Sequence, residues 1–141
     1  MRTVEINVCG ENAVTFPRGT TVEEALAECR EHSSSTPTIA AFVNNEVRAL
    51  SYRLGINAEI RPIPVGSAEG QRVYRRSLCY ALAIASYQSL PNARLVIGHS
   101  LGNAYYYYFD DRDADEDLLE TLRNALRNTV ERDLPIRRGV V

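Results

Sequence analysis

Apolar and polar residues alternate in short runs through the first part of the chain, and this pattern predicts β-strands. Residues 2–8 place Val4, Ile6 and Val8 on one face, as in a strand buried on one side only. Short apolar runs bounded by turn residues continue the pattern. The further strands are expected at 13–17, 38–43, 46–50 and 58–65.

One helix is expected between the second and third strands. Val22, Ala25, Leu26 and Cys29 repeat at the spacing of a helix that buries one stripe. A threonine at position 20 or 21, with a glutamate three residues later, predicts a capping box at its start. In the last strand, Pro62 and Pro64 suit a sheet edge or a strand end.

The pattern changes after the stretch GSAEG at 66–70, which is interpreted as a linker. A long helix is expected from about residue 70 to Pro91, and its apolar half at 78–85 is expected to be largely buried. Strands at 94–98 and 104–109 would form a hairpin around a loop at 99–103. A second helix from 116, entered through an acidic stretch and stopped by Pro135, completes the pattern.

Composition narrows the chemistry available to the chain. Hydrophobic residues make up 45% and charged residues 24% of the 141 residues, which is ordinary for a globular protein. All 16 basic residues are arginine, so the chain contains no Walker A lysine and no lysine nucleophile. With a net charge of −2, the chain has no overall basic surface for nucleic acid, so any such binding would need a local basic patch.

The expected environment is a reducing cytoplasm. No apolar run approaches a membrane span of about 18 residues, and the N-terminus lacks the apolar core of a signal peptide. The 3 cysteines are widely spaced without a C-x-x-C pair, so each is expected to be a small core residue rather than part of a disulfide or zinc site. We expect no metal ion in this chain.

The string Gly98-His99-Ser100-Leu101-Gly102 fits the G-x-S-x-G turn of α/β-hydrolases. That triad needs a histidine after the serine, whereas the only histidines are His32 and His99. The serine is also expected in a hairpin loop rather than at a strand-to-helix turn. We therefore expect no catalytic residue here, and a local side-chain-to-backbone hydrogen bond for Ser100.

The first 65 residues resemble a known module. The stretches FPRGTTVEEAL and AAFVNNEVRALSYRL are similar to the helix entry and central hairpin of the TGS domain, a β-grasp, ubiquitin-like module. This resemblance implies an α+β chain with a β-grasp domain at 1–65 and a second unit at 66–141.

The second unit resembles the start of the second additional domain of threonyl- and alanyl-tRNA synthetases. The stretch RVYRRSLCYALAIASYQSLPNARLVIGHSLGNAYYYYFD carries this resemblance. In that family, two histidines on the first helix, with a later cysteine and histidine, form a metal-dependent editing site. Those helix positions are Arg76 and Tyr80 here, and Ala104 replaces a glycine before the tyrosines. Arginine has no free lone pair for a metal, so editing hydrolysis is not expected.

The strings VYRRSLCYAL, IGHSLGNAYYY and ERDLPIRR also resemble bacterial uridine kinase-like proteins. That resemblance implies a non-catalytic regulatory or ligand-binding module preceding a C-terminal kinase domain, which would use ATP and Mg²⁺ as a transferase. The alternatives are an RNA-binding N-terminal fragment of a threonyl-tRNA synthetase-like protein and a pure protein-interaction module. Nothing in the sequence specifies the oligomeric state.

The candidate binding residues follow from these resemblances and from residue chemistry. Arg76, Tyr80, Gly98, His99 and Tyr107 are expected to line a relic of the editing pocket. Arg72 and Arg75, near the start of the long helix, are candidate contacts to phosphate or RNA. An anionic ligand, such as a nucleotide or the end of a tRNA, is the expected partner.

The four consecutive tyrosines at 105–108 belong to the returning strand. Alternation places Tyr105 and Tyr107 on one face and Tyr106 and Tyr108 on the other. One pair is expected to pack on the alanine-rich helix, and packing is favoured over base stacking for both pairs.

Overall fold

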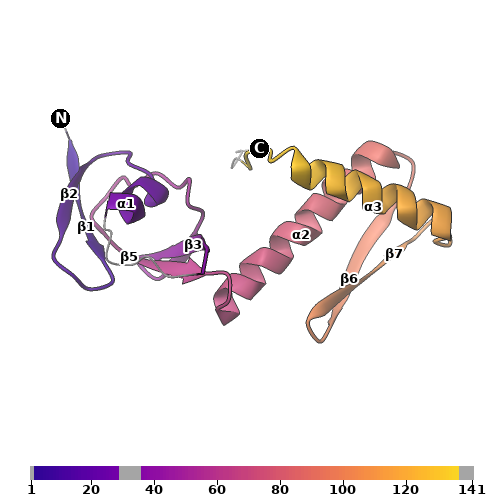
Figure 1. The fold of residues 1–141 in the computed structure, drawn as a ribbon, viewed down its shortest axis with the longest axis horizontal. Helices are drawn as coiled ribbons and strands as arrows, with labels where there is room; N and C mark the ends of the chain where they lie inside the picture. The colour runs from indigo at the N-terminus through magenta and orange to yellow at the C-terminus, as the bar shows by residue number, and fades with distance from the viewer. Residues whose placement is uncertain (1, 29–35, 137–141) are drawn as a thin grey trace. The chain divides into compact units, whose positions relative to one another are not determined.

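The chain forms two compact units, Met1–Arg75 and Arg76–Val141, in a computed structural model that describes residues 2–28 and 36–136. The described residues form a five-stranded sheet, a two-stranded sheet and three helices (Figure 1). The expected α+β class is therefore confirmed. The domain boundary expected between residues 65 and 66 stays a prediction.

The first unit has the arrangement of a β-grasp domain. Its sheet runs in the order β2-β1-β5-β3-β4, with β1 and β5 parallel and the other pairs antiparallel. The helix α1 (Val22–Glu28) follows the β1–β2 hairpin, as the apolar pattern predicted. The strands are β1 (Thr3–Val8), β2 (Val14–Pro17), β3 (Thr38–Val43), β4 (Glu46–Arg48) and β5 (Ala58–Pro64).

The core of this unit lies between the sheet and α1. Val4, Ile6 and Val8 are all buried, which confirms the alternation expected for β1. Val22 and Ala25 of α1 are buried in the same cluster. Full burial of a valine or isoleucine side chain contributes about 1.5–3 kcal/mol relative to exposure, so this packing holds the helix on the sheet.

Local signals in the sequence produce the expected helix start and turn. The Thr21 amide donates to Glu24 Oε2 at 2.7 Å, and the Glu24 amide donates to Thr21 Oγ1 at 3.2 Å, which is a reciprocal capping box. Asn44 and Asn45 join β3 to β4 with φ of 48° and 67°. Two left-handed residues in a two-residue loop form the type I′ turn that asparagine tolerates.

The last strand of this unit is central rather than at the edge. β5 lies between β1 and β3, so the edge position allowed for Pro62 and Pro64 is wrong. Pro64 is the last residue of β5, as expected for a strand end, whereas Pro62 lies inside the strand and pairs with Ala41 of β3. β1 pairs only with Ala58 to Ile60. Both prolines lie beyond that ladder, so their missing N–H groups remove no hydrogen bond to β1.

The helix α2 (Ala68–Ser89) begins in the first unit and continues into the second. Ser67 caps its start, because the Gly70 amide donates to Ser67 Oγ at 3.0 Å. The second unit also contains the hairpin β6 (Leu95–Leu101) and β7 (Ala104–Phe109), followed by α3 (Glu116–Glu131).

A small core holds the second unit together. Ala85 of α2, Phe109 of β7 and Leu122 of α3 are buried against one another, with partly buried apolar neighbours from α2, β6, the connection between them, and α3. In Figure 1, α3 runs across both α2 and the hairpin. Asp115 caps α3 by accepting from the Leu118 amide at 2.8 Å, so part of the acidic stretch is a helix start as expected.

Two expectations for this unit are corrected. β6 continues to Leu101, so Ser100 lies in a strand and pairs with Tyr105 instead of lying in a loop. The connecting turn needs only two residues because Gly102 adopts a φ of 57°. The apolar half of α2 is less buried than expected, since Leu78 is 39% exposed although it shares a helix face with the core residues Leu82 and Ala85.

The positions of the cysteines and of His32 can also be compared with the sequence expectations. Cys9 is exposed in a turn with φ of 55°, so its expected core position is wrong. Cys79 is partly buried. Cys29 and His32 lie outside the described residues. Within residues 2–28 and 36–136, no helix is long and apolar enough to cross a membrane.

Candidate functional site

The arginines near the start of α2 lie on a well-anchored helix. Ser67 caps the helix, and Gln71 Nε2 donates to the Val65 carbonyl at 2.9 Å. Arg72 is exposed, whereas Arg75 is partly buried and donates from Nε to the Gln71 carbonyl at 3.2 Å. The anchored backbone therefore presents Arg72 to solvent and holds Arg75 closer to the helix.

Arg76 and Tyr80 stand one helical turn apart at the beginning of the second unit. Arg76 is exposed, and 54% of the Tyr80 side chain is exposed. Residues separated by four positions share a helix face. Neither a guanidinium nor a phenol at neutral pH provides the neutral nitrogen ligand that an imidazole offers to a metal.

A β-bulge sets the geometry of the hairpin. Ile97 pairs with Tyr107 and Ser100 pairs with Tyr105, so Gly98 and His99 together lie opposite Tyr106. The extra residue bends β6 locally.

The rings of Tyr106 and Tyr108 lie over Gly98 on one face of the hairpin. Their centroids are 5.9 Å apart, and the His99 ring lies 5.8 Å from that of Tyr106. A Cβ built on Gly98 would come within 3.6 Å of Tyr106 Cδ1 and 3.9 Å of Tyr108 Cε1. These are ordinary van der Waals distances, so the approach of the rings to the backbone does not itself require glycine at this position.

Tyr107 belongs to the other face of the hairpin. It pairs with Ile97 and is two residues from the buried Phe109, so strand alternation directs it to the same face as Phe109. The structure therefore brings Gly98 and His99 together with Tyr106, and separates both from Tyr107. The alternation expected for the four tyrosines is present, although each remains 38–47% exposed.

Polar contacts close the open end of the hairpin, and sequence reasoning did not identify them. Asp111 Oδ1 accepts from the Arg94 amide at 2.9 Å, and Arg112 donates to Asp111 and to the Asn92 carbonyl. The Arg112 guanidinium and the Arg94 amide lower the pKa of Asp111 below its ordinary value. The sequence signal for them is an arginine among aspartates directly after a strand, a stretch that the preference of carboxylates for helix starts assigns only to α3.

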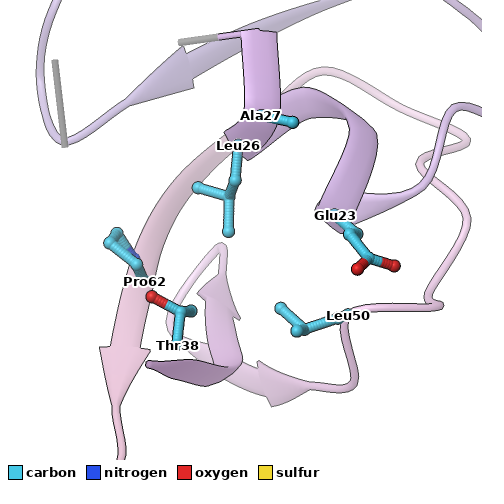
Figure 2. Close-up of a pocket in the computed structure, with 6 residues that line it drawn as sticks. All are labelled: Glu23, Leu26, Ala27, Thr38, Leu50 and Pro62. Carbon is cyan, nitrogen blue, oxygen red and sulfur yellow. The ribbon is translucent and has the colours of Figure 1, made fainter. Parts of the chain in front are cut away.

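The first unit contains a pocket of about 250 Å³ between α1 and the sheet. Figure 2 shows Leu26 of α1 reaching into it, with Leu50 and Pro62 on the other side and the Glu23 carboxylate at its rim. Leu26 and Leu50 also pack against the main core. The lining is mainly apolar, so it offers little chemistry for an anionic ligand. The remaining lining residues are Ala27 and Thr38.

No site with metal-ligand chemistry is found in the part of the chain that the structure describes. No group of three or more His, Cys, Asp or Glu side chains gathers there in an arrangement that could hold an ion. Of the acidic residues near the hairpin, Asp111 contacts Arg112 and accepts from the Arg94 amide, and Asp115 accepts from the Leu118 amide.

The architecture is thus that of an α+β protein with a β-grasp unit and a helix–hairpin–helix unit, and comparison with known proteins extends this class. No protein-family model matches the chain. The chain is nevertheless homologous to N-terminal regions of threonyl-tRNA synthetases.

The similarity covers most of this chain but a small part of each relative. It is 31% identical to the threonine–tRNA ligase of Desulforamulus reducens over 121 residues, which cover 85% of this chain and 19% of the ligase. The ligase of Symbiobacterium thermophilum is 31% identical over 127 residues, with 89% and 19% covered. The ligase of Haloquadratum walsbyi is 27% identical over 136 residues, with 96% and 21% covered. The chain therefore spans about a fifth of the length of these relatives.

Proposed function

We propose that this chain is a non-catalytic RNA-binding module related to the N-terminal region of threonyl-tRNA synthetases. The observation that carries this proposal is the similarity to those regions, which extends over 85% to 96% of the chain for the ligases of D. reducens and H. walsbyi. We further propose that the β-grasp unit is a TGS domain, because its helix entry and central hairpin carry the resembling strings.

Arginines on α2 would supply the contacts to RNA. Arg72 and Arg76 are both exposed and lie one helical turn apart on α2. A guanidinium offers a planar fork of donors that matches a phosphate. With a net charge of −2, the chain can attract RNA only through a local group of this kind.

The same positions argue against editing chemistry. The related synthetase domain binds its metal through two histidines where this chain has Arg76 and Tyr80. A guanidinium cannot ligate a metal, and a phenol at neutral pH is a weak substitute for an imidazole. Binding without hydrolysis is the function that these residue types favour.

The proposal is tested by fluorescence anisotropy with labelled tRNA and a charge-matched pair of variants. The test variant is Arg72→Gln/Arg75→Gln/Arg76→Gln. The control is Arg123→Gln/Arg127→Gln/Arg132→Gln, which removes the same charge around the exposed side of α3. We expect the test variant to weaken binding at low salt about tenfold and the control less than about twofold. Equal effects would contradict the assignment to α2.

A second candidate is a module attached to a uridine kinase-like enzyme. Its support is the resemblance of the strings VYRRSLCYAL, IGHSLGNAYYY and ERDLPIRR, whereas the relatives named above are all synthetases. Sequencing downstream of the gene separates the two. A G-x-x-x-x-G-K-[ST] motif would favour the kinase, and a class II synthetase core would favour the synthetase.

A further inference from the structure

We propose that a second pocket, in the helix–hairpin–helix unit, binds a single unstacked nucleotide, with the base inside and the phosphate at Arg94. The pocket has a volume of about 320 Å³ and lies between the last turns of α2 and strand β6. Its lining residues are Ala83, Ser86, Tyr87, Pro91, Ala93, Arg94, Leu95 and Ile97. None of them belongs to the five residues of the relic pocket expected from the sequence.

The two walls of the pocket follow from helix and strand geometry. Ala83, Ser86 and Tyr87 are spaced three and four residues apart, so they share one face of α2. Leu95 and Ile97 are two residues apart and share one face of β6. Small side chains at Ala83 and Ala93 leave the space between these walls open.

Ser86 provides a polar group inside this otherwise apolar space. It is 3% exposed, and its hydroxyl has no hydrogen-bond partner in the described part of the chain. Ser89 and Thr129, by contrast, each donate to a carbonyl four residues earlier in their helices, at 2.7 and 2.9 Å. A buried hydroxyl without a partner is costly, so a ligand with a polar edge would gain more here than an aliphatic side chain.

The rim adds an aromatic ring and a cation. Tyr87 is 79% exposed and can move over a bound ring, because base–aromatic stacking needs only a free face. The Arg94 side chain is 77% exposed, and its contact with Asp110 is 3.5 Å long between two solvated groups. Such an exposed pair is weak, so a phosphate can compete with Asp110 for Arg94. Together these features fit a heteroaromatic ring that carries an anionic group.

This inference rests on the proposed function only in choosing a nucleotide as the ligand. The shared chemistry is a base joined to a phosphate, and it is found both in a free nucleotide and in an unpaired nucleotide of RNA. Calorimetric titration of the full chain with uridine and adenosine 5′-monophosphates measures the first source. Titration with a six-nucleotide single-stranded RNA measures the second. Ribose 5-phosphate, which lacks a base, is the ligand control.

Three variants test the pocket and one serves as a control. We expect Ser86→Ala to weaken binding about fivefold, Arg94→Gln about tenfold, and Ala83→Leu, which fills the space, at least as much. Arg127→Gln on α3 should leave binding unchanged. Circular dichroism of each variant checks folding, and Ser86→Ala should fold normally because it only removes an unpaired hydroxyl.

Binding of either nucleotide source by the wild-type chain, together with its loss in these variants, would support the proposal. Equal affinity for ribose 5-phosphate, or nucleotide binding that Ser86→Ala and Ala83→Leu do not change, would overturn it. Absence of binding to both sources would overturn it as well. If neither nucleotide source binds but tRNA still binds the wild-type chain through α2, only the pocket fails. If nucleotides bind while tRNA does not, the proposed RNA-binding function fails alone.

Discussion

At the scale of single residues, a glycine at the start of α2 is required by its surroundings. A Cβ built on Gly70 would overlap the Pro64 carbonyl oxygen and lie 3.0 Å from Ser67 Oγ. Backbone cannot move aside as cheaply as the end of a flexible side chain. At Gly66, the nearest atom to a Cβ is Thr36 Cγ2 at an ordinary 3.7 Å.

We therefore expect Gly70→Ala to reduce the free energy of unfolding by about 1–3 kcal/mol, because the added methyl must displace backbone. Gly66→Ala is the matched control and should change it by less than about 0.5 kcal/mol. Urea denaturation followed by circular dichroism measures both. Similar values for the two variants would show that the contact with Pro64 is not a constraint.

Two carboxylates make stability depend on pH. The backbone and side-chain hydrogen bonds of Thr21 lower the pKa of Glu24, and Arg112, followed by the Arg94 amide, lowers that of Asp111. A lowered pKa in the folded state means that the unfolded chain binds protons first on acidification. Stability is then complete above the ordinary values of 4.5 and 3.8 and is lost as pH falls through the lowered ones.

We expect the double variant Glu24→Gln/Asp111→Asn to show a flatter fall in melting temperature between neutral pH and strongly acidic pH. The reason is that neither replacement can take up a proton in this range. Glu23→Gln/Asp113→Asn removes the same number of charges from neighbouring exposed positions as a control. A fall as steep as that of the wild type in the first variant would contradict the assignment.

At the scale of elements, the helix α3 depends on one apolar stripe. Leu122 is 2% exposed in the core of the second unit, whereas Val130 is 56% exposed on the same helix. Periodicity assigns both residues to one apolar stripe of the helix, but it does not show where the neighbouring hairpin ends.

We expect Leu122→Ala to destabilise the second unit by about 2–5 kcal/mol, through lost burial and the cavity left behind. Val130→Ala should cost less than about 1 kcal/mol, because its side chain keeps most of its contact with water in the folded state. Hydrogen exchange measured by mass spectrometry reports both units. Faster exchange should appear in α2, the hairpin and α3, but not in β1 or β5. Faster exchange in β1 and β5 to the same degree would show that the units are not separate.

Most elements could be predicted from sequence because their signals are local. The Thr21–Glu24 capping box and the left-handed Asn44–Asn45 turn each lie within four residues, and both are present. The central position of β5 could not be predicted, since it depends on parallel pairing with β1, more than fifty residues away. The same limit applies to the hairpin, where the bulge at Gly98 and His99 places Tyr107 on the opposite face.

At the scale of the whole molecule, the sequence similarity and the exposed arginines support the same proposed function. Similarity to synthetase N-terminal regions supports the proposed RNA-binding role, and exposed arginines on α2 offer a local site for it in a chain of net charge −2. The resemblance places Arg76 and Tyr80 where the related domain holds its metal, and on that basis we propose binding rather than hydrolysis. The pocket beside Ser86 is a separate site that the sequence pattern did not indicate, because its residues are small or apolar.

The most direct test of the central claim is the salt dependence of tRNA binding to the full chain. Each phosphate neutralised by an arginine contributes a slope of about −0.7 to −0.9 to a plot of log affinity against log salt concentration. With Arg72, Arg75 and Arg76 engaged, we expect a slope of about −2 to −3, which should approach zero when all three are changed to glutamine. No binding at low salt, or a slope that the three substitutions leave unchanged, would contradict the claim that α2 is an RNA-binding surface.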